Sequence, residues 1–271
     1  MKRARLALKY LLAAFIAVVF MFPVYYIFMV SLLPQEAIFD YPPRIVPFPP
    51  TLANYPMALT GFQGLLGLKN SLLVGGAVTV ITMAVGALAA YSLARFRIGG
   101  RHLPFWILSQ RMMPPIAAII PVFLLMRSLR LMDTVQALVI AQLITILPFG
   151  IWFMRGFFTE VPVEIEEAAL IDGCSRLVTL WRIALPLAAP GIAVTALLTF
   201  VLSWNELLFA VVLTRGSAIT LPVTMANSLT AHGIAFPILA SLAMISVLPV
   251  IIIAIVAQRY LVRGLTLGAL Q

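Results

Sequence analysis

Six stretches of the sequence are long and apolar enough to cross a lipid bilayer, and they limit the fold more than any other feature. They occupy residues 10–33, 71–94, 103–126, 134–154, 187–213 and 234–258. Each exceeds the roughly 20 residues that a helix needs to cross about 30 Å of hydrocarbon. Lipid offers the backbone no hydrogen-bond partner, so we expect helices. With 63% hydrophobic residues, the sequence predicts an all-α membrane protein with six transmembrane helices, forming one domain over residues 1–271.

The distribution of basic residues predicts the orientation of these spans. The chain has 18 Lys and Arg against 9 Asp and Glu, a formal net charge of +9. When the N-terminus is placed in the cytoplasm, twelve basic residues fall on inside segments, five fall outside and Arg111 lies within a span. Such a bias predicts that both termini are cytoplasmic. It also explains the net charge without a nucleic-acid partner.

Several kinds of chemistry find no support in the sequence. A single cysteine and two histidines offer little for a metal cluster, and we predict no metal or cofactor on this chain. A phosphate-binding Gly-x-x-x-x-Gly-Lys-Ser/Thr loop does not occur, so the chain is not expected to hydrolyse ATP. No histidine lies within a span to activate a serine, which argues against an intramembrane enzyme of the serine–histidine kind.

Two connections between the apolar stretches are too long for simple turns. Residues 34–70, on the predicted outer side, contain seven prolines and suggest an ordered, extended strap; a flexible linker is the alternative. Residues 155–186, on the predicted inner side, hold five of the nine acidic residues. This inner loop has the most specific pattern in the chain.

The inner loop is predicted to form two short helices joined by a sharp bend. Pro162 suits the first turn of a helix, and three glutamates follow it near the positive end of the helix dipole. Gly173 is suited to a left-handed cap that ends this helix. Ser175 can cap a second helix over residues 176–184, which we expect to stop at Leu185-Pro186.

This loop resembles a known motif. Glu167-Ala168-Ala169, three residues, Gly173, nine residues and Ile183-x-Leu185-Pro186 resemble the EAA loop of ABC-importer permeases. In that family the loop forms a coupling helix that docks into a cleft of the ATP-hydrolysing subunit. The resemblance implies that ATPase coupling involves Glu166, Glu167, Ala168, Ala169, Leu170, Asp172, Gly173, Ile183, Leu185 and Pro186. The residues alone also allow an amphipathic helix resting on lipid headgroups.

Further stretches resemble the carbohydrate branch of these permeases, in particular the second permease of maltose-type importers. They are Phe22-Pro23-Val24-Tyr25, Asn54-Tyr55, Asn70-Ser71, Arg111-Met112-x-Pro114-Pro115, Ser203-Trp204-Asn205-Glu206 and the tail Arg263-Gly264-Leu265-Thr266-Leu267-Gly268-Ala269. The resemblance implies a permease subunit of a binding-protein-dependent ABC importer in a bacterial or archaeal cytoplasmic membrane. It would form half of the pathway for a sugar or sugar-like solute. The implied partners are membrane lipid, a second homologous permease, two ATP-binding subunits that hold ATP and Mg²⁺, and an external solute-binding protein.

Four residues within the spans are candidates for the solute pathway. A charge at the centre of a membrane helix costs about 2.5–3.5 kcal/mol on the insertion scale, so Arg111 and Glu206 each need water or a partner. Three roles are open for Arg111 and Glu206: they line the pathway, they pair with each other, or they join helices far from the solute. Trp204 and Asn205 offer an aromatic face and an amide, which suit a sugar; packing is the alternative for Trp204.

Small residues and prolines within the spans predict how the helices pack and bend. Thr82, Gly86, Ala90 and Ala94 recur at every fourth position, which predicts a close helix–helix contact. Prolines such as Pro114 can kink helices that border a pathway, or only aid packing.

An ion-coupled secondary carrier is the alternative function, although it would be expected to place several carboxylates within spans.

Overall fold

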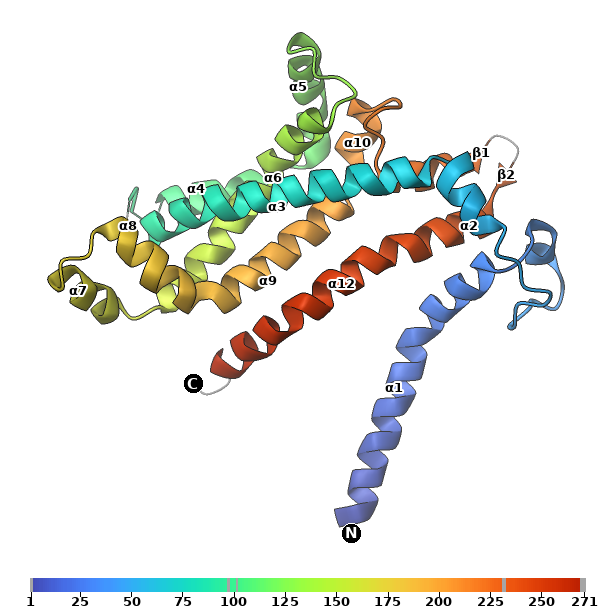
Figure 1. Cartoon of the computed structure of the whole chain (residues 1–271), viewed down its shortest axis with the longest axis horizontal. Helices are drawn as coiled ribbons and strands as arrows, with labels where there is room; N and C mark the ends of the chain where they lie inside the picture. The colour runs from blue at the N-terminus through green and yellow to red at the C-terminus, as the bar shows by residue number, and fades with distance from the viewer. Residues whose placement is uncertain (1, 97, 101, 231–232, 269–271) are drawn as a thin grey trace. The chain divides into compact units, whose positions relative to one another are not determined.

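The computed structural model describes residues 2–96, 98–100, 102–230 and 233–268, and helices dominate it (Figure 1). The elements in chain order are α1 (Lys2–Ser31), η1 (Gln35–Phe39), α2 (Asn54–Pro56), η2 (Met57–Gly61), α3 (Gly64–Arg95), α4 (His102–Ser109), η3 (Gln110–Met112), α5 (Pro115–Ser128), α6 (Val135–Glu160), α7 (Val163–Ile171), α8 (Arg176–Thr179), η4 (Leu180–Ala184), α9 (Leu185–Trp204), α10 (Leu208–Leu213), α11 (Leu221–Asn227), β1 (Leu229–Thr230), β2 (Gly233–Ile234) and α12 (Phe236–Gly268). The two short strands pair antiparallel. Five described helices are long and apolar enough to cross a membrane, or six when one bent pair is counted as a span. The predicted all-α membrane fold is confirmed.

The third apolar stretch is divided into two helical pieces. The α4–η3 piece and α5 meet at 88°, whereas the sequence predicted one span over residues 103–126. Met113 and Pro114 between them adopt ψ values of 125° and 127°. Each is followed by a proline, whose ring disfavours the helical region for the preceding residue. Two consecutive prolines therefore produce a sharp bend here rather than a mild kink.

The fifth apolar stretch is also interrupted. Helix α9 ends at Trp204 and α10 begins at Leu208, inside the predicted span 187–213. A carboxylate stabilises the new start, because Glu206 accepts hydrogen bonds from the backbone N–H groups of Phe209 (2.7 Å) and Ala210 (3.3 Å). Side-chain acceptors at this position satisfy the free donors of a helix N-terminus.

The helix predicted for residues 176–184 does not stop at Leu185-Pro186, so that prediction is wrong. Helix α8 continues through η4, a π-helical segment, into α9, and the three form one apolar helix over Arg176–Trp204. In the π segment the Leu185 N–H donates to the Leu180 carbonyl, five residues back. Pro186 then lies in the first turn of α9, where its missing donor is tolerated.

The chain divides into two compact units, residues 1–66 with 224–249 and residues 67–223 with 250–271. In the first unit the proline-rich strap is fixed to the end of α1. The Asn54 side-chain amide donates to the carbonyls of Ser31 and Leu33, each at 2.9 Å. The Tyr55 hydroxyl lies 2.8 Å from the Ser31 hydroxyl, and the Thr51 N–H donates to the Leu32 carbonyl at 2.8 Å. This part of the strap is therefore ordered, as predicted.

The core of the second unit forms where α3, α6 and α9 lie side by side (Figure 1). Glycines allow this close packing. A Cβ at Gly150 would lie 2.3 Å from Thr82 Cγ2, and one at Gly86 would lie 2.6 Å from Met154 Cε, so α3 and α6 are in tight contact. A Cβ at Gly191 would overlap the Phe157 ring. The small-residue contact predicted for this stretch of α3 is confirmed.

The start of α3 is fixed to the loop that follows α10. The Asn70 side-chain amide donates to the carbonyls of Ser217 (3.0 Å) and Ile219 (2.8 Å). The Ser71 hydroxyl accepts from the Leu221 N–H at 2.9 Å. These bonds satisfy the backbone of a loop that would otherwise leave buried polar groups unpaired.

Candidate functional site

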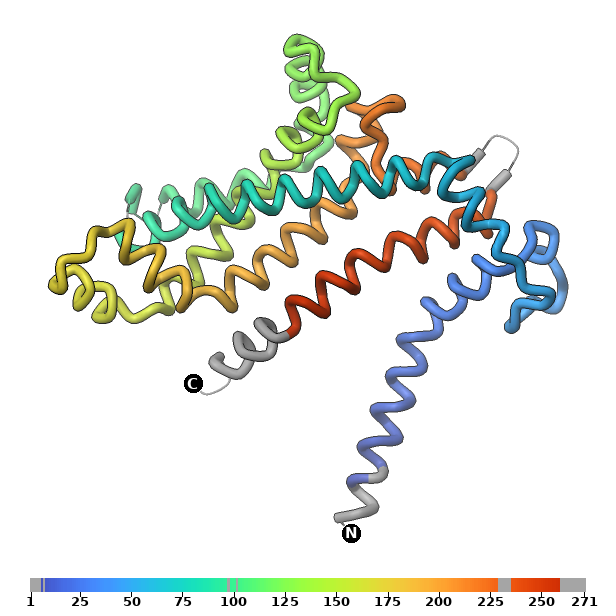
Figure 2. Tube along the Cα trace, in the orientation of Figure 1, coloured from blue at the N-terminus to red at the C-terminus, as the bar shows by residue number. Residues whose placement is uncertain are grey.

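Helix α7 is a short helix between two bends, and Figure 2 shows the chain turning back on itself from α6 through α7 into α8 and α9. Gly173 has φ +87°, so the predicted left-handed cap is confirmed. The N–H groups of Gly173 and Cys174 donate to the carbonyls of Leu170 (3.1 Å) and Ala169 (3.0 Å), which closes the helix end. The predicted cap at Ser175 is also confirmed, since its hydroxyl accepts from the Val178 N–H.

One face of α7 is exposed. It carries Glu167 and Ala168, followed by Leu170 and Ile171, with Asp172 at the C-terminal cap. Ile171 is 85% exposed and was not among the residues selected from the sequence, although an apolar residue at the end of an acidic helix is a signal that could have identified it. An exposed face with an acidic rim and an apolar end is suited to contact with another protein.

The opposite face of α7 is buried against the chain itself. Glu166 is 4% exposed, and Ala169 is buried beside it. The Glu166 carboxylate accepts from Arg95 Nε (2.8 Å) and from the Tyr91 hydroxyl (2.7 Å), and Arg95 Nη2 lies 2.7 Å from the same carboxylate. Arg95 Nη2 also donates to the Val161 carbonyl at 2.8 Å. Glu166 thus differs from its exposed neighbour Glu167, because its side chain contacts α3 rather than an open surface.

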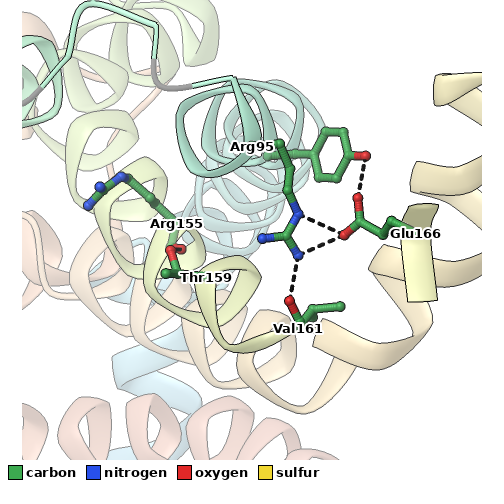
Figure 3. Close-up of polar contacts among 6 residues, drawn as sticks. Arg95, Arg155, Thr159, Val161 and Glu166 are labelled. Atoms are coloured by element: carbon green, nitrogen blue, oxygen red, sulfur yellow. Dashed lines mark hydrogen bonds and ion pairs between the residues drawn. The ribbon is translucent and has the colours of Figure 1, made fainter. Parts of the chain in front are cut away.

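Figure 3 shows the side chains of Arg95 and Glu166 pointing toward each other, with the Val161 carbonyl below them. The guanidinium of Arg155 points away from this group and lies over the Trp152 ring, 5.8 Å from its centre. The positive charge that compensates Glu166 is therefore that of Arg95.

Aromatic rings surround the buried carboxylate. The Tyr91 ring packs edge-to-face on Phe158 (5.6 Å between centroids) and on Phe96 (6.1 Å). The Arg176 guanidinium lies 4.8 Å from the centroid of Phe96. A carboxylate in an apolar environment is stable only when it is paired and hydrogen-bonded, and here both conditions are met.

Sequence reasoning missed Tyr91 and Arg95 as members of this site. Arg95 was used only as one of the charges that orient the spans, although a charge directly after a long apolar stretch is a usable signal. The remaining predicted loop residues lie in η4 and α9, where Ile183 and Leu185 are partly buried and Pro186 is exposed.

The predicted pathway residues are divided between the break after α9 and the bend before α5. Trp204 is 3% exposed and stacks on Phe200, with 5.4 Å between ring centroids, so it packs within the chain. Asn205 is exposed, and its amide donates to the Val201 carbonyl at 2.8 Å. Of the two, Asn205 is the one available to a solute.

Arg111 and Glu206 do not pair with each other. The Arg111 guanidinium lies over the Phe149 ring, 4.4 Å from its centroid, which is a cation–π contact. Glu206 instead accepts from two backbone N–H groups and from the side-chain amide of Gln142 at 3.4 Å. Gln142, which also accepts from the Ser203 hydroxyl, was missed, although a glutamine inside an apolar stretch is a visible signal.

The remaining features considered in the sequence are metal ligands, the two histidines and the C-terminal tail. Among the described residues, no group of three or more histidine, cysteine or acidic side chains could hold a metal ion. His102 is exposed at the start of α4, and His232 lies outside the residues that the structure describes. Of the tail, residues 263–268 continue α12, and Ala269 also lies outside the described residues.

Membrane-spanning helices with two interruptions, together with a short helix held at the end of the bundle with one face exposed, define a multi-pass permease subunit. The chain belongs to the family of binding-protein-dependent transport system inner membrane components, and the sequence match to this family covers residues 82–267. More than half of the sequence, including α7 and both interruptions, falls within the matched region.

Individual relatives agree with this family. The chain is 38% identical over 94% of its length to a probable ABC transporter permease of Sinorhizobium fredii, and covers 92% of that protein. It is 35% identical over 96% of its length to a trehalose/maltose transport system permease of Thermococcus litoralis, covering 94% of it. A bacterial ABC transporter that imports the acidic polysaccharide alginate contains a chain of similar structure, with a TM-score of 0.74, 27% identity and coverage of 96% and 97% of the two chains.

The chain is therefore the membrane-spanning permease subunit of an ABC importer, a multi-pass protein of the inner membrane. ATP hydrolysis in such importers is carried out by a separate subunit. Membership of the family also implies a partner permease and a solute-binding protein. Nothing in these comparisons supports an ion-coupled carrier.

Proposed function

We propose that this permease forms half of the translocation pathway for a sugar or sugar-like solute and couples it to ATP hydrolysis through α7. Support for the solute class comes from relatives that are permeases of transport systems for trehalose and maltose, for trehalose and for diacetylchitobiose. The exposed face of α7, formed by Glu167, Ala168, Leu170 and Ile171, is the observation that carries the coupling role.

The proposed assembly has two permeases, two ATP-binding subunits and an external binding protein. ATP and Mg²⁺ belong to the ATP-binding subunits, and α7 docks on one of these from the cytoplasm, where both termini of the chain also lie. Glu167 meets a basic side chain of that subunit. Ala168 allows close approach, while Leu170 and Ile171 fill an apolar cleft. Closure of the ATPase pair on ATP binding then pulls α7 and turns the pathway outward, and hydrolysis resets it.

The pathway itself is proposed to pass the two interruptions in the spans. Non-helical backbone at membrane depth is tolerated where it is buried or lines a water-filled cavity, and interrupted helices often border the solute pathway of transporters. Asn205 at one interruption and Arg111 at the other are exposed polar residues. Trp204 and Glu206 support this region by ending α9 and beginning α10.

The docking proposal is tested by reversing one charge on the exposed face. Glu167→Lys should abolish co-purification with the ATP-binding subunit and uptake by whole cells, while the permease still inserts in the membrane. Glu160→Lys is the matched control, because Glu160 is also an exposed glutamate but belongs to the end of α6, outside the docking face. Gly173→Val, which strains a residue at φ +87°, should weaken the same association. Uptake that is unchanged in both Glu167→Lys and Gly173→Val would contradict the proposal.

The solute proposal is tested at Asn205. Asn205→Ala should reduce uptake of radiolabelled sugars from a panel that includes trehalose and maltose, because the exposed amide no longer bonds a sugar hydroxyl. Assembly with the partner subunits, measured by co-purification, should not change. A loss of assembly would instead make Asn205 a packing residue and remove it from the pathway.

A further inference from the structure

We propose that Glu166, Arg95 and Tyr91 form a clamp that stops α7 from swivelling, so that movement of the docked helix is passed to the spans. The three are positioning residues, because the exposed residues of α7 make the docking contact and the clamp acts through them. The inference rests on the proposed docking of α7, and its test is designed to fail separately from that proposal.

The need for a clamp follows from how α7 is joined to the chain. A non-helical link connects it to α6 at Val161-Pro162, and a second, around Gly173, connects it to α8. A short helix held only at its two ends can rotate about the line that joins them. A third attachment away from that line fixes its orientation. Glu166 lies in the middle of α7 and provides this attachment.

The attachment reaches a distant part of the chain. Arg95 and Tyr91 precede Glu166 by 71 and 75 residues, and both belong to the last turns of α3. They are four residues apart, so they project from the same face of that helix. Two donors from one rigid helix hold the carboxylate more firmly than a single flexible side chain could.

Geometry and burial make the clamp stiff. Oε1 of Glu166 lies 2.8 Å from Arg95 Nε and 2.7 Å from Arg95 Nη2, and Oε2 lies 2.7 Å from the Tyr91 hydroxyl. The side chains of Arg95 and Glu166 are 8% and 6% exposed. Charge-assisted hydrogen bonds shielded from water are stronger than exposed ones. Because Arg95 also donates to the Val161 carbonyl at 2.8 Å, the same guanidinium fixes one of the two links.

Two adjacent glutamates of α7 have different roles in this proposal. Glu166 faces inward and Glu167 faces outward, since adjacent helix positions differ by about 100°. The end of α3 that Glu166 contacts packs on α6 through the buried cluster that contains Tyr91 and Phe158. A displacement of α7 is therefore transmitted to α3 as well as to α6 and α8, which precede and follow α7 in the chain.

The test measures coupling rather than assembly. In the full transporter in proteoliposomes, Glu166→Gln should lower the solute transported per ATP hydrolysed by about fivefold or more, while co-purification with the ATP-binding subunit persists. Glu160→Gln, which neutralises an exposed glutamate at the end of α6, is the matched control and should leave this ratio unchanged. Arg95→Gln should resemble Glu166→Gln, and the double variant should be no worse than either single variant, because one interaction is removed only once. An unchanged ratio in Glu166→Gln would overturn the proposal.

A milder variant covers the case in which Glu166→Gln does not assemble. Tyr91→Phe keeps the ring that packs on Phe158 and removes one hydrogen bond, so it should lower the same ratio by about twofold. If Tyr91→Phe transports as much solute per ATP as the unaltered protein, the proposal is overturned.

Swivelling can also be observed directly. With Cys174→Ser as background, spin labels at Leu88→Cys on α3 and Val163→Cys on α7 should give a narrow distance distribution in the assembled transporter. Adding Glu166→Gln should broaden it, and adding Glu160→Gln should not. A distribution that stays narrow would overturn the clamp. Failure of the docking proposal is seen elsewhere, as intact ATPase association in Glu167→Lys, and does not alter this result.

Discussion

Two carboxylates near opposite ends of α3 are satisfied in different ways. Near its start, Asp133 accepts hydrogen bonds from four successive backbone N–H groups, those of residues 215–218, at 2.9–3.2 Å. Near its end, Glu166 accepts from two side chains, those of Arg95 and Tyr91. The Asp133 site depends on the backbone conformation of the loop at residues 215–218. The Glu166 site depends on the side chains of Arg95 and Tyr91.

The difference decides what each site tolerates. Burial raises the pKa of the Asp133 carboxyl, but the four backbone donors outweigh it and hold this pKa below its ordinary value. No substitution of the donors' side chains other than by proline removes those N–H groups. The Glu166 site loses a donor whenever Arg95 or Tyr91 is replaced. The loop site should therefore depend on Asp133 alone, and the clamp on all of its members.

Removal of Arg95 should have the largest effect. Arg95→Leu leaves the Glu166 carboxylate buried without a compensating charge, and breaking a buried pair in this way costs roughly 3–5 kcal/mol. The free energy of unfolding of the purified permease, measured by titration with a denaturing detergent, should fall by this amount. Arg182→Leu is the matched control, since Arg182 is exposed on η4. Equal losses in the two variants would mean that the buried pair adds no stability.

Replacement of the loop carboxylate should have the next largest effect. Asp133→Asn keeps the shape and tolerates the positive φ of 58°, but it removes the charge that four donors face. Hydrogen bonds to a charged group contribute about 1.5–3 kcal/mol, so we expect a loss of about 2 kcal/mol in the same measurement. The control is Asp40→Asn, which breaks a partly exposed ion pair with Arg44 and should cost less than about 1 kcal/mol.

The contribution of the loop site should also depend on pH. Because the pKa of Asp133 is lowered on folding, the unfolded chain binds the proton more readily, and stability rises with pH in that range. The contribution of Asp133 is complete above the ordinary carboxyl pKa of about 3.9 and is lost as pH falls below it. The difference in unfolding free energy between the unaltered protein and Asp133→Asn should therefore shrink below about pH 4. A difference that stays constant down to pH 3 would contradict this account.

Much of the fold could be predicted because lipid leaves so few alternatives. Apolar length alone located the membrane helices, and Gly173 and Ser175 predicted how α7 ends and α8 begins. The interruptions were harder to predict. Pro114-Pro115 suggested a kink, but the 88° bend depends on two adjacent residues leaving the helical region together. Glu206 was interpreted as a buried charge, whereas it caps α10.

The candidate site was predicted in outline and not in its contacts. The pattern around Glu167 predicted the short helix α7, which we propose docks on the ATP-binding subunit, but it placed Glu166 with the coupling residues. Adjacent glutamates lie on different faces of a helix, and only the position of Arg95 decides which one points inward. Contacts across 71 residues of sequence leave no local signal. The four N–H groups around Asp133 belong to a loop whose conformation no residue pattern specified.

The smallest effects give the sharpest contrast between the two sites. Arg215 and Ser217 are exposed and contact Asp133 through their backbone N–H groups, so Arg215→Ala and Ser217→Ala should change the unfolding free energy by less than about 0.5 kcal/mol. Tyr91→Phe removes only one oxygen atom, but that atom is a side-chain donor at Glu166, and its loss should cost about 1 kcal/mol. If the two alanine variants are as destabilising as Tyr91→Phe, side chains rather than the backbone support the loop site, and the distinction between the two carboxylates fails.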